Sequence, residues 1–192
     1  MRCVVLDIET SALEAVGAGF VLCTVLKPLG EKPICLRYDK LSCHPGQEKP
    51  LIRKTFDILS EYDLWIGHNL QAFDVPYLRS RAIQLDIPLP PKRPFLYDTK
   101  LAFKRTGFRT RDNGFGKPSA SLAMVADFFG IPQQKTALYP SEHWKTVWQE
   151  GKERQRAMDE LCDHCLRDVS MNEKVYWKLL EVDSVWGLRR VN

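Results

Sequence analysis

The sequence predicts an α/β fold on a mixed five-stranded sheet, with three antiparallel strands followed by parallel strands and with helices on both faces. Three short apolar segments joined by short links open the chain. Helical and strand-like periods then alternate, and helical patterns dominate the end. No repeat and no interdomain linker interrupts this order, so residues 1–192 are expected to form a single domain.

The first three strands are expected at 2–6, 20–26 and 34–38, where apolar and β-branched residues dominate. Pro28 and Gly30 close the second of these segments. Because the links between the three segments are short, we expect them to form an antiparallel meander.

The middle of the chain alternates between helix and strand. The hydrophobic period becomes that of a helix at about 50–62. A short strand at 64–66 leads into a helix at about 73–85, and a fifth strand at 95–97 leads into a helix from Thr99. This alternation predicts that the later strands run parallel in the sheet.

Helices follow in the remainder of the chain. Residues 107–118 contain three glycines and a proline and are expected to form a loop. Ser119 or Ser121 is expected to cap a short helix. A helix near 142–149 then precedes the longest helix, from 152 to about 182.

Composition excludes several classes of protein. With 44% hydrophobic and 27% charged residues among 192, the chain is neither disordered nor of low complexity. No apolar run approaches the ~18 residues of a membrane span, and Asp7 comes too early for a signal peptide, so we expect a soluble cytoplasmic protein. The six cysteines are irregularly spaced, and Cys162 and Cys165 lie inside a helical pattern, which favours neither a disulfide framework nor a zinc or redox site.

Positive charge is concentrated in residues 92–117. This segment holds eight basic and two acidic residues, with five aromatic residues among them. Basic groups neutralise phosphates and aromatic faces stack on bases, so the composition suits nucleic-acid binding, with Arg109 and Arg111 as candidate contacts. The alternative is a solvated loop whose aromatic residues belong to the core.

Asp7 and Glu9 form the first candidate site. They end the first strand, and residues two apart in a strand share a face. Two carboxylates on one face repel each other unless a cation lies between them, and Mg²⁺ prefers such oxygen ligands. The alternative is a strand end that enters solvent.

Two further acids occupy positions from which they can join this pair. Asp74 begins the helix after the fourth strand, where an acid also stabilises a helix N-terminus. Asp98 has the same position after the fifth strand and is expected to be an N-cap. Asp168 falls within about 40° of the apolar stripe of the longest helix, one turn after His164. These two residues form either part of a site or a His–Asp pair in the core.

The four carboxylates together indicate phosphoryl chemistry. Asp7, Glu9, Asp74 and Asp168 lie at strand ends and on helices that can converge at one edge of the sheet. Four acids that hold two Mg²⁺ or Mn²⁺ ions form a site for in-line displacement at phosphorus.

The motifs around these acids resemble those of the DEDD (DnaQ-like) 3′–5′ exonuclease superfamily, which has a ribonuclease-H-like fold. Its first motif resembles residues 6–10, LDIET; its second resembles residues 67–78, GHNLQAFDVPYL; its third resembles residues 164–169, HCLRDV. The segment 121–126, followed by Gly130 and Lys135, makes the resemblance closest to the proofreading exonuclease domain of family-B DNA polymerases.

The third motif departs from the family pattern. The family has either Tyr with Asp four residues later or His with Asp five residues later. Here His164 stands four residues before Asp168, and Asp163 stands five residues before it. The chain thus resembles the tyrosine subgroup with histidine in the place of the tyrosine. No polymerase domain is attached in this sequence, so a proofreading role is not carried over.

The resemblance implies stepwise release of nucleoside 5′-monophosphates from a 3′ end. The four carboxylates would hold two divalent cations, and His164 would orient or deprotonate the attacking water. Thr10, Asn69 and Phe73 would contact the terminal nucleotides. The implied partner is nucleic acid, with single-stranded DNA 3′ ends favoured. The alternatives are an exoribonuclease that trims short RNA and a non-catalytic nucleic-acid-binding module on the same fold.

Overall fold

The protein is described by a computed structural model that covers residues 1–17, 19–41, 47–108, 110, 120–132, 147 and 151–186. One five-stranded sheet lies at its centre, in the order β3-β2-β1-β4-β5. The strands are β1 (Cys3–Thr10), β2 (Val21–Pro28), β3 (Ile34–Arg37), β4 (Leu64–Gly67) and β5 (Phe95–Asp98). The first three strands pair antiparallel, and β4 and β5 continue parallel from β1. The mixed sheet predicted from the sequence is therefore confirmed.

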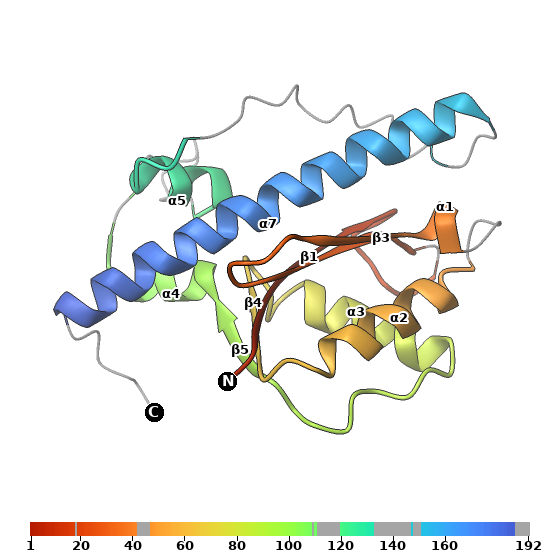
Figure 1. The fold of residues 1–192 in the computed structure, drawn as a ribbon, viewed down its shortest axis with the longest axis horizontal. Helices are drawn as coiled ribbons and strands as arrows, with labels where there is room; N and C mark the ends of the chain where they lie inside the picture. The colour runs from red at the N-terminus through yellow and green to blue at the C-terminus, as the bar shows by residue number, and fades with distance from the viewer. Residues whose placement is uncertain are drawn as a thin grey trace.

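Helices cover both faces of this sheet (Figure 1). The long helix α7 (Lys152–Trp186) crosses one face and contacts β1 and β2, with α4 (Thr99–Arg105) and α5 (Leu122–Phe128) packed against it. On the other face lie α2 (Lys49–Leu59) and α3 (Asp74–Gln84). None of the helices that the structure describes has the length and apolar character needed to cross a membrane.

Strand β1 extends further than the sequence predicted, and this matters for the site. Its pairing with β2 continues past Leu6, so that Asp7 lies opposite Val25 and Glu9 opposite Cys23. Ile8 between the two acids is buried, which keeps the alternation of the strand intact. The two acids are thus held inside a paired strand, close to its end at Thr10.

Other boundaries also differ from the predictions. The helix expected to reach Tyr62 ends at Leu59, and Tyr38 does not extend β3 but begins a single-turn helix, α1 (Tyr38–Leu41). α7 continues four residues beyond the expected end at 182. The predicted helix at 142–149 lies outside the described residues apart from Val147, as does most of the predicted loop at 107–118.

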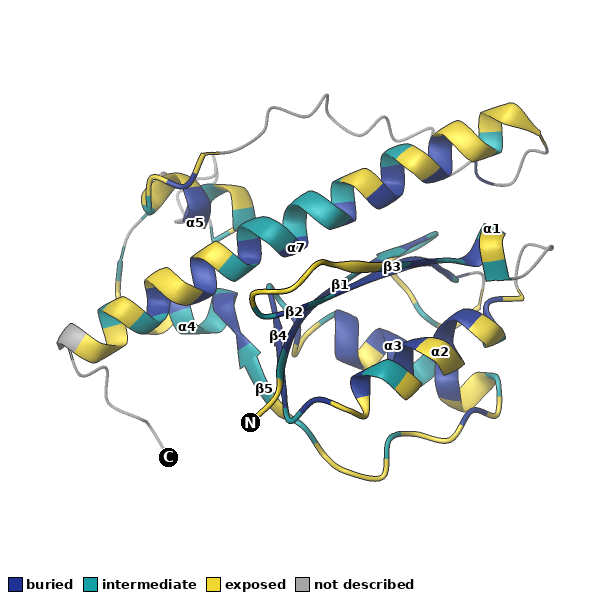
Figure 2. Cartoon of the chain, viewed as in Figure 1, coloured by how far each residue is buried: buried dark blue, intermediate teal, exposed yellow. Residues whose placement is uncertain are grey.

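Two apolar clusters hold these elements together. In the larger one Val4, Val5 and Leu6 are consecutive and at most 1% exposed, which requires cover on both faces of β1 (Figure 2). The smaller cluster fixes α4 and α5 on α7 and consists of Phe103, Val125, Ala126, Ile131, Val175 and Leu179. Because α5 is held in this way, it forms one wall of a cavity beside the middle of α7.

Candidate active site

Asp7 and Glu9 lie on the face of β1 that α7 covers. The Cys165 thiol on α7 donates a hydrogen bond to Asp7 Oδ2 across 3.1 Å. His164 Nε2, one residue earlier on the same helix, lies 3.9 Å from Glu9 Oε1. The prediction that the two acids share a face is confirmed, and the element opposite them is the helix that carries the third motif.

Asp74, which follows the neighbouring strand β4, also lies beside this part of β1. It is the first residue of α3 and is only 2% exposed. The parallel pairing of β1 with β4 reaches only Val5, and beyond it Asp74 Oδ1 accepts a hydrogen bond from the Ile8 backbone N–H at 3.2 Å. This bond places the Asp74 carboxylate beside the segment of β1 that carries Asp7 and Glu9.

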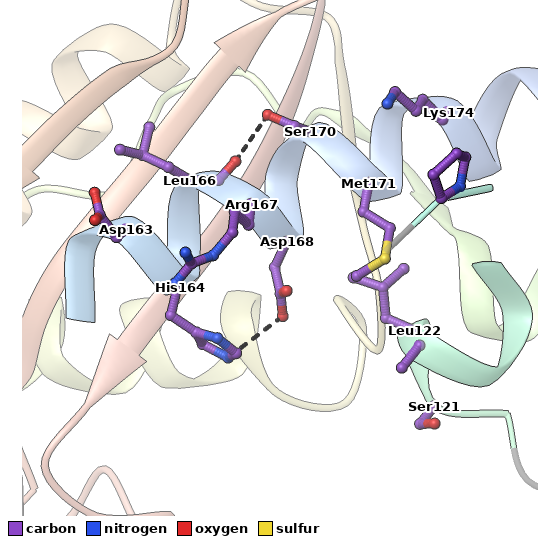
Figure 3. A pocket seen from close by; sticks show the side chains of 12 residues that line it. Ser121, Leu122, Asp163, His164, Leu166, Arg167, Asp168, Ser170, Met171 and Lys174 are labelled. Atoms are coloured by element: carbon purple, nitrogen blue, oxygen red, sulfur yellow. Dashed lines mark hydrogen bonds and ion pairs between the residues drawn. The ribbon is translucent and has the colours of Figure 1, made fainter. Parts of the chain in front are cut away.

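His164 and Asp168 project together from the middle of α7 (Figure 3). His164 Nε2 lies 3.7 Å from Asp168 Oδ2, one helical turn away, so the imidazole faces carboxylates on two different elements. The side chain of Asp168 is 28% exposed, which places it at the border of the buried stripe of α7. His164 and Asp168 are therefore accessible from solvent and are not a pair enclosed in the core.

Burial raises the pKa values of all four carboxyl groups, and the charges of neighbouring acids raise those of Asp7, Glu9 and Asp74 further. Burial, followed by the charge of Asp168, raises the pKa of Asp7 to about 7. The pKa of Glu9 is raised well above its usual value by burial and then by the charges of the other three acids. Burial and Asp7 raise the pKa of Asp74, and burial raises that of Asp168. Each carboxylate thus lies within the electric field of another, which is the convergence that the sequence predicted.

The donor set has the chemistry of a hard divalent cation site. Carboxylate oxygens are the ligands that Mg²⁺ and Mn²⁺ prefer, and a cation would relieve the repulsion among these four. Within the described ranges, no three or more His, Cys, Asp or Glu side chains are already arranged as a complete metal site. Two of the acids instead have protein partners, Cys165 for Asp7 and the Ile8 N–H for Asp74.

The loop of the second motif is held by Asp98. Asn69 has a positive φ of 68°, a left-handed conformation that asparagine adopts more readily than most residues. The Asp98 carboxylate accepts the backbone N–H groups of Asn69 and Gln71 at 3.1 and 3.0 Å. It also caps α4 through the N–H groups of Lys100 and Leu101, which confirms the predicted N-cap.

The predicted substrate contacts have different surroundings. Asn69 Oδ1 accepts a hydrogen bond from Lys100 Nζ at 3.0 Å, so its side chain is oriented by a cation. Phe73 is half-buried, with its ring centroid 5.5 Å from that of Tyr77. The buried Thr10 hydroxyl donates to the Ala12 carbonyl oxygen at 2.8 Å, which turns it towards its own loop. Arg109 and Arg111 lie outside the described residues.

Two neighbours of the acids were not assigned to the site from the sequence. Cys165 was interpreted as part of a Cys-x-x-Cys pair and quoted within the third motif, whereas its thiol contacts Asp7. Arg167 was quoted only as part of the third motif, whereas it lines the cavity beside His164 and Asp168. Each lies one position from a motif residue on α7, and adjacent helix positions point in different directions, so the sequence held no specific signal for either contact.

A mixed sheet of this topology, with carboxylates gathered beside its central strand, is the architecture of an RNase H-like nuclease. Residues 4–180 match the RNase H superfamily, and the chain belongs to this superfamily. Nucleases of this kind generally use divalent metal ions. Comparison with curated proteins finds no match.

The fold is shared with part of a much larger enzyme. Similar solved structures include the family B DNA polymerase from the hyperthermophilic archaeon Pyrobaculum calidifontis, with a TM-score of 0.70 and 20% sequence identity. The similarity covers 93% of this chain and 24% of the polymerase chain, so the chain spans about a quarter of that enzyme's length. The fold predicted from the three motifs is therefore confirmed.

Proposed function

We propose that the protein is a metal-dependent 3′–5′ exonuclease that hydrolyses phosphodiester bonds in nucleic acid, with single-stranded DNA as the favoured substrate. The observation that carries the proposal is the convergence of Asp7, Glu9, Asp74 and Asp168 with His164 at one place beside β1. Membership of the RNase H superfamily supports the nuclease class.

The four carboxylates are the residues that would hold two divalent cations. Bound there, the cations would lower the pKa of the attacking water and stabilise the charge that develops on the phosphate and on the leaving oxygen. Glu9 and Asp7 are fixed by the pairing of β1, and Asp74 is fixed by its bond to Ile8. Ligands on paired strands and helices hold their geometry better than ligands on loops.

His164 would orient or deprotonate the nucleophilic water. Its Nε2 lies near both Glu9 and Asp168 and is accessible from solvent, so a water between these groups is within reach. A neutral imidazole accepts a proton, and the two neighbouring carboxylates would stabilise the imidazolium that forms. Histidine thereby fills the position of the tyrosine in the related subgroup.

Asn69 and Phe73 would contact the terminal nucleotides. Both belong to the segment between β4 and Asp74, so they flank the carboxylates. The Phe73 ring offers an apolar surface for a base or sugar, and the amide of Asn69 is oriented by Lys100. Thr10 would act by shaping the loop after β1, because its hydroxyl is already bonded to Ala12.

The test is incubation of 5′-labelled single-stranded DNA and RNA with Mg²⁺ or Mn²⁺, with EDTA as the control. We expect a ladder that shortens from the 3′ end, faster for DNA than for RNA. A ladder with RNA alone would identify an exoribonuclease, which recognises the 2′-hydroxyl. Binding without any cleavage would identify a non-catalytic module and overturn the proposal.

A further inference from the structure

The cavity next to the carboxylates carries a second row of side chains from α7. It has a volume of about 620 Å³ and lies between the middle of α7 and the start of α5, where Leu122 lines it. One row on α7 consists of His164 and Asp168, and the adjacent row consists of Arg167, Met171 and Lys174 (Figure 3). The proposed catalytic side chains and the basic side chains of Arg167 and Lys174 thus line the same cavity.

Among the residues that the structure describes, Arg167 has no hydrogen-bond or ion-pair partner. Its Nε is buried and makes no hydrogen bond, and within the described part of the chain the side chain has no ion pair. Lys174, which is exposed, also lacks an ion pair in the same part of the chain. By contrast, Arg156 and Lys178 on the same helix pair with Glu160 and Glu181. A buried donor without an acceptor is unfavourable, so Arg167 is poised for an external acceptor.

We propose that Arg167 binds a non-scissile backbone phosphate of the substrate strand and that Lys174 contacts the strand further along α7. This inference rests on the proposed nuclease function and deepens it. The Arg167 side chain is only partly buried and lines the cavity, and a planar guanidinium matches the oxygens of a phosphate. Met171 and Leu122 supply apolar contacts for the sugars or bases between the two phosphates.

The positions of Arg167 and Lys174 on α7 define the path of a nucleic-acid strand whose 3′ end lies at the carboxylates. Arg167 precedes Asp168 by one residue, whereas Lys174 lies about two helical turns beyond Arg167 on α7. A strand whose 3′ end reaches the carboxylates would therefore meet Arg167 close to the reacting phosphate and Lys174 further from it. Arg167 acts here on binding, so its loss is expected to raise KM and to leave kcat within about twofold.

The test combines Arg167→Gln with single-stranded DNA in which one phosphate at a time is a neutral methylphosphonate. Binding is measured in EDTA, which prevents cleavage. With the native protein, neutralising one non-scissile phosphate near the 3′ end should weaken binding about tenfold. Arg167→Gln should bind unmodified DNA about tenfold more weakly and lose no further affinity at that position, because the two changes remove the same contact. The slope of log affinity against log salt should decrease by about 0.7.

Arg156→Gln is the matched control, because Arg156 is an exposed arginine of α7 that already pairs with Glu160. It should keep the native profile, and Arg167→Lys should recover part of the affinity because the charge remains. If Arg167→Gln shows the same methylphosphonate profile as the native protein and an unchanged melting temperature, the inference is wrong although the nuclease proposal stands. If the native protein neither binds nor cleaves nucleic acid, both are wrong.

Discussion

The surroundings of Asp7 make its ionised carboxylate unfavourable in the absence of a cation. A carboxylate placed between β1 and α7, beside three other acids, has its pKa raised to about 7 by burial and by Asp168. Such an arrangement destabilises the protein without a cation and becomes favourable when a cation is bound. In the proposed metal site, a bound cation would offset this loss of stability.

The raised pKa of Asp7 predicts how the stability of the metal-free protein depends on pH. Because the pKa rises from 3.8 to about 7 on folding, the unfolded chain loses this proton near pH 4, whereas the folded protein keeps it up to about pH 7. The free energy of unfolding is therefore highest below pH ~4 and decreases as the pH rises through 7. Melting temperatures in EDTA should fall between pH 4.5 and 7.5 and then level off. Asp7→Asn should give a shallower fall. An equal fall in both proteins would show that Asp7 is not the strained group.

His164 is expected to act on the reaction and not on the fold. Its side chain is 35% exposed, and its Nε2 lies near Glu9 and Asp168. His164→Ala should lower kcat by roughly 10²–10⁴-fold, the usual contribution of an acid–base group. His164→Tyr should keep substantial activity, because it restores the residue of the related subgroup. Rates are compared at saturating DNA, and a native rate for His164→Ala would reduce His164 to a structural residue.

At the scale of elements, the turn between β4 and α3 depends on a residue from another strand. Asp98 at the end of β5 accepts four backbone N–H groups, two from the second-motif loop and two from α4. It thereby joins the loop that carries Asn69 to the helix that follows the next strand. This connection orients the segment that leads to Asp74.

Asp98→Ala should therefore affect stability and activity together. Loss of the cap and of the two loop bonds should cost about 2–4 kcal/mol of unfolding free energy, measured in denaturant. Ser121→Ala is the control, because Ser121 caps α5, and it should cost about 1 kcal/mol. Activity well below the melting temperature should fall for Asp98→Ala alone. Equal effects of the two variants would show that Asp98 is merely a helix cap.

Element prediction succeeded where local periodicity decides and failed where tertiary contacts decide. The long helix α7 and the cap residues Asp98 and Ser121 follow from apolar spacing and capping chemistry, and the structure confirms them. The positions on β2 that pair with Asp7 and Glu9 depend on tertiary contacts, which no local pattern shows. The hydrogen bond from the Asn69 backbone N–H to Asp98 joins residues 29 positions apart, and it likewise could not be predicted from the sequence.

The strand order explains why distant acids meet. The central strand β1 has β4 as its parallel neighbour, so the segments after β4 lead back to the face and end of β1 that carry Asp7 and Glu9. α7 crosses the same region and adds Asp168. The motif spacing predicted this convergence, whereas the contacts of Cys165 and Arg167 required the packed helix.

The central claim is that Asp168 and its three partner acids form one metal-dependent nuclease centre. The most direct measurement compares release of the labelled 3′-terminal nucleotide, in saturating Mg²⁺, by the native protein, Asp168→Asn and Asp163→Asn. Asp163 is an exposed acid that lines the same cavity from the same helix. We expect Asp168→Asn to lower the rate by more than the ~100-fold that loss of an outer partner of a metal site costs. Asp163→Asn should remain within about twofold of the native rate. A native rate for Asp168→Asn would contradict the account.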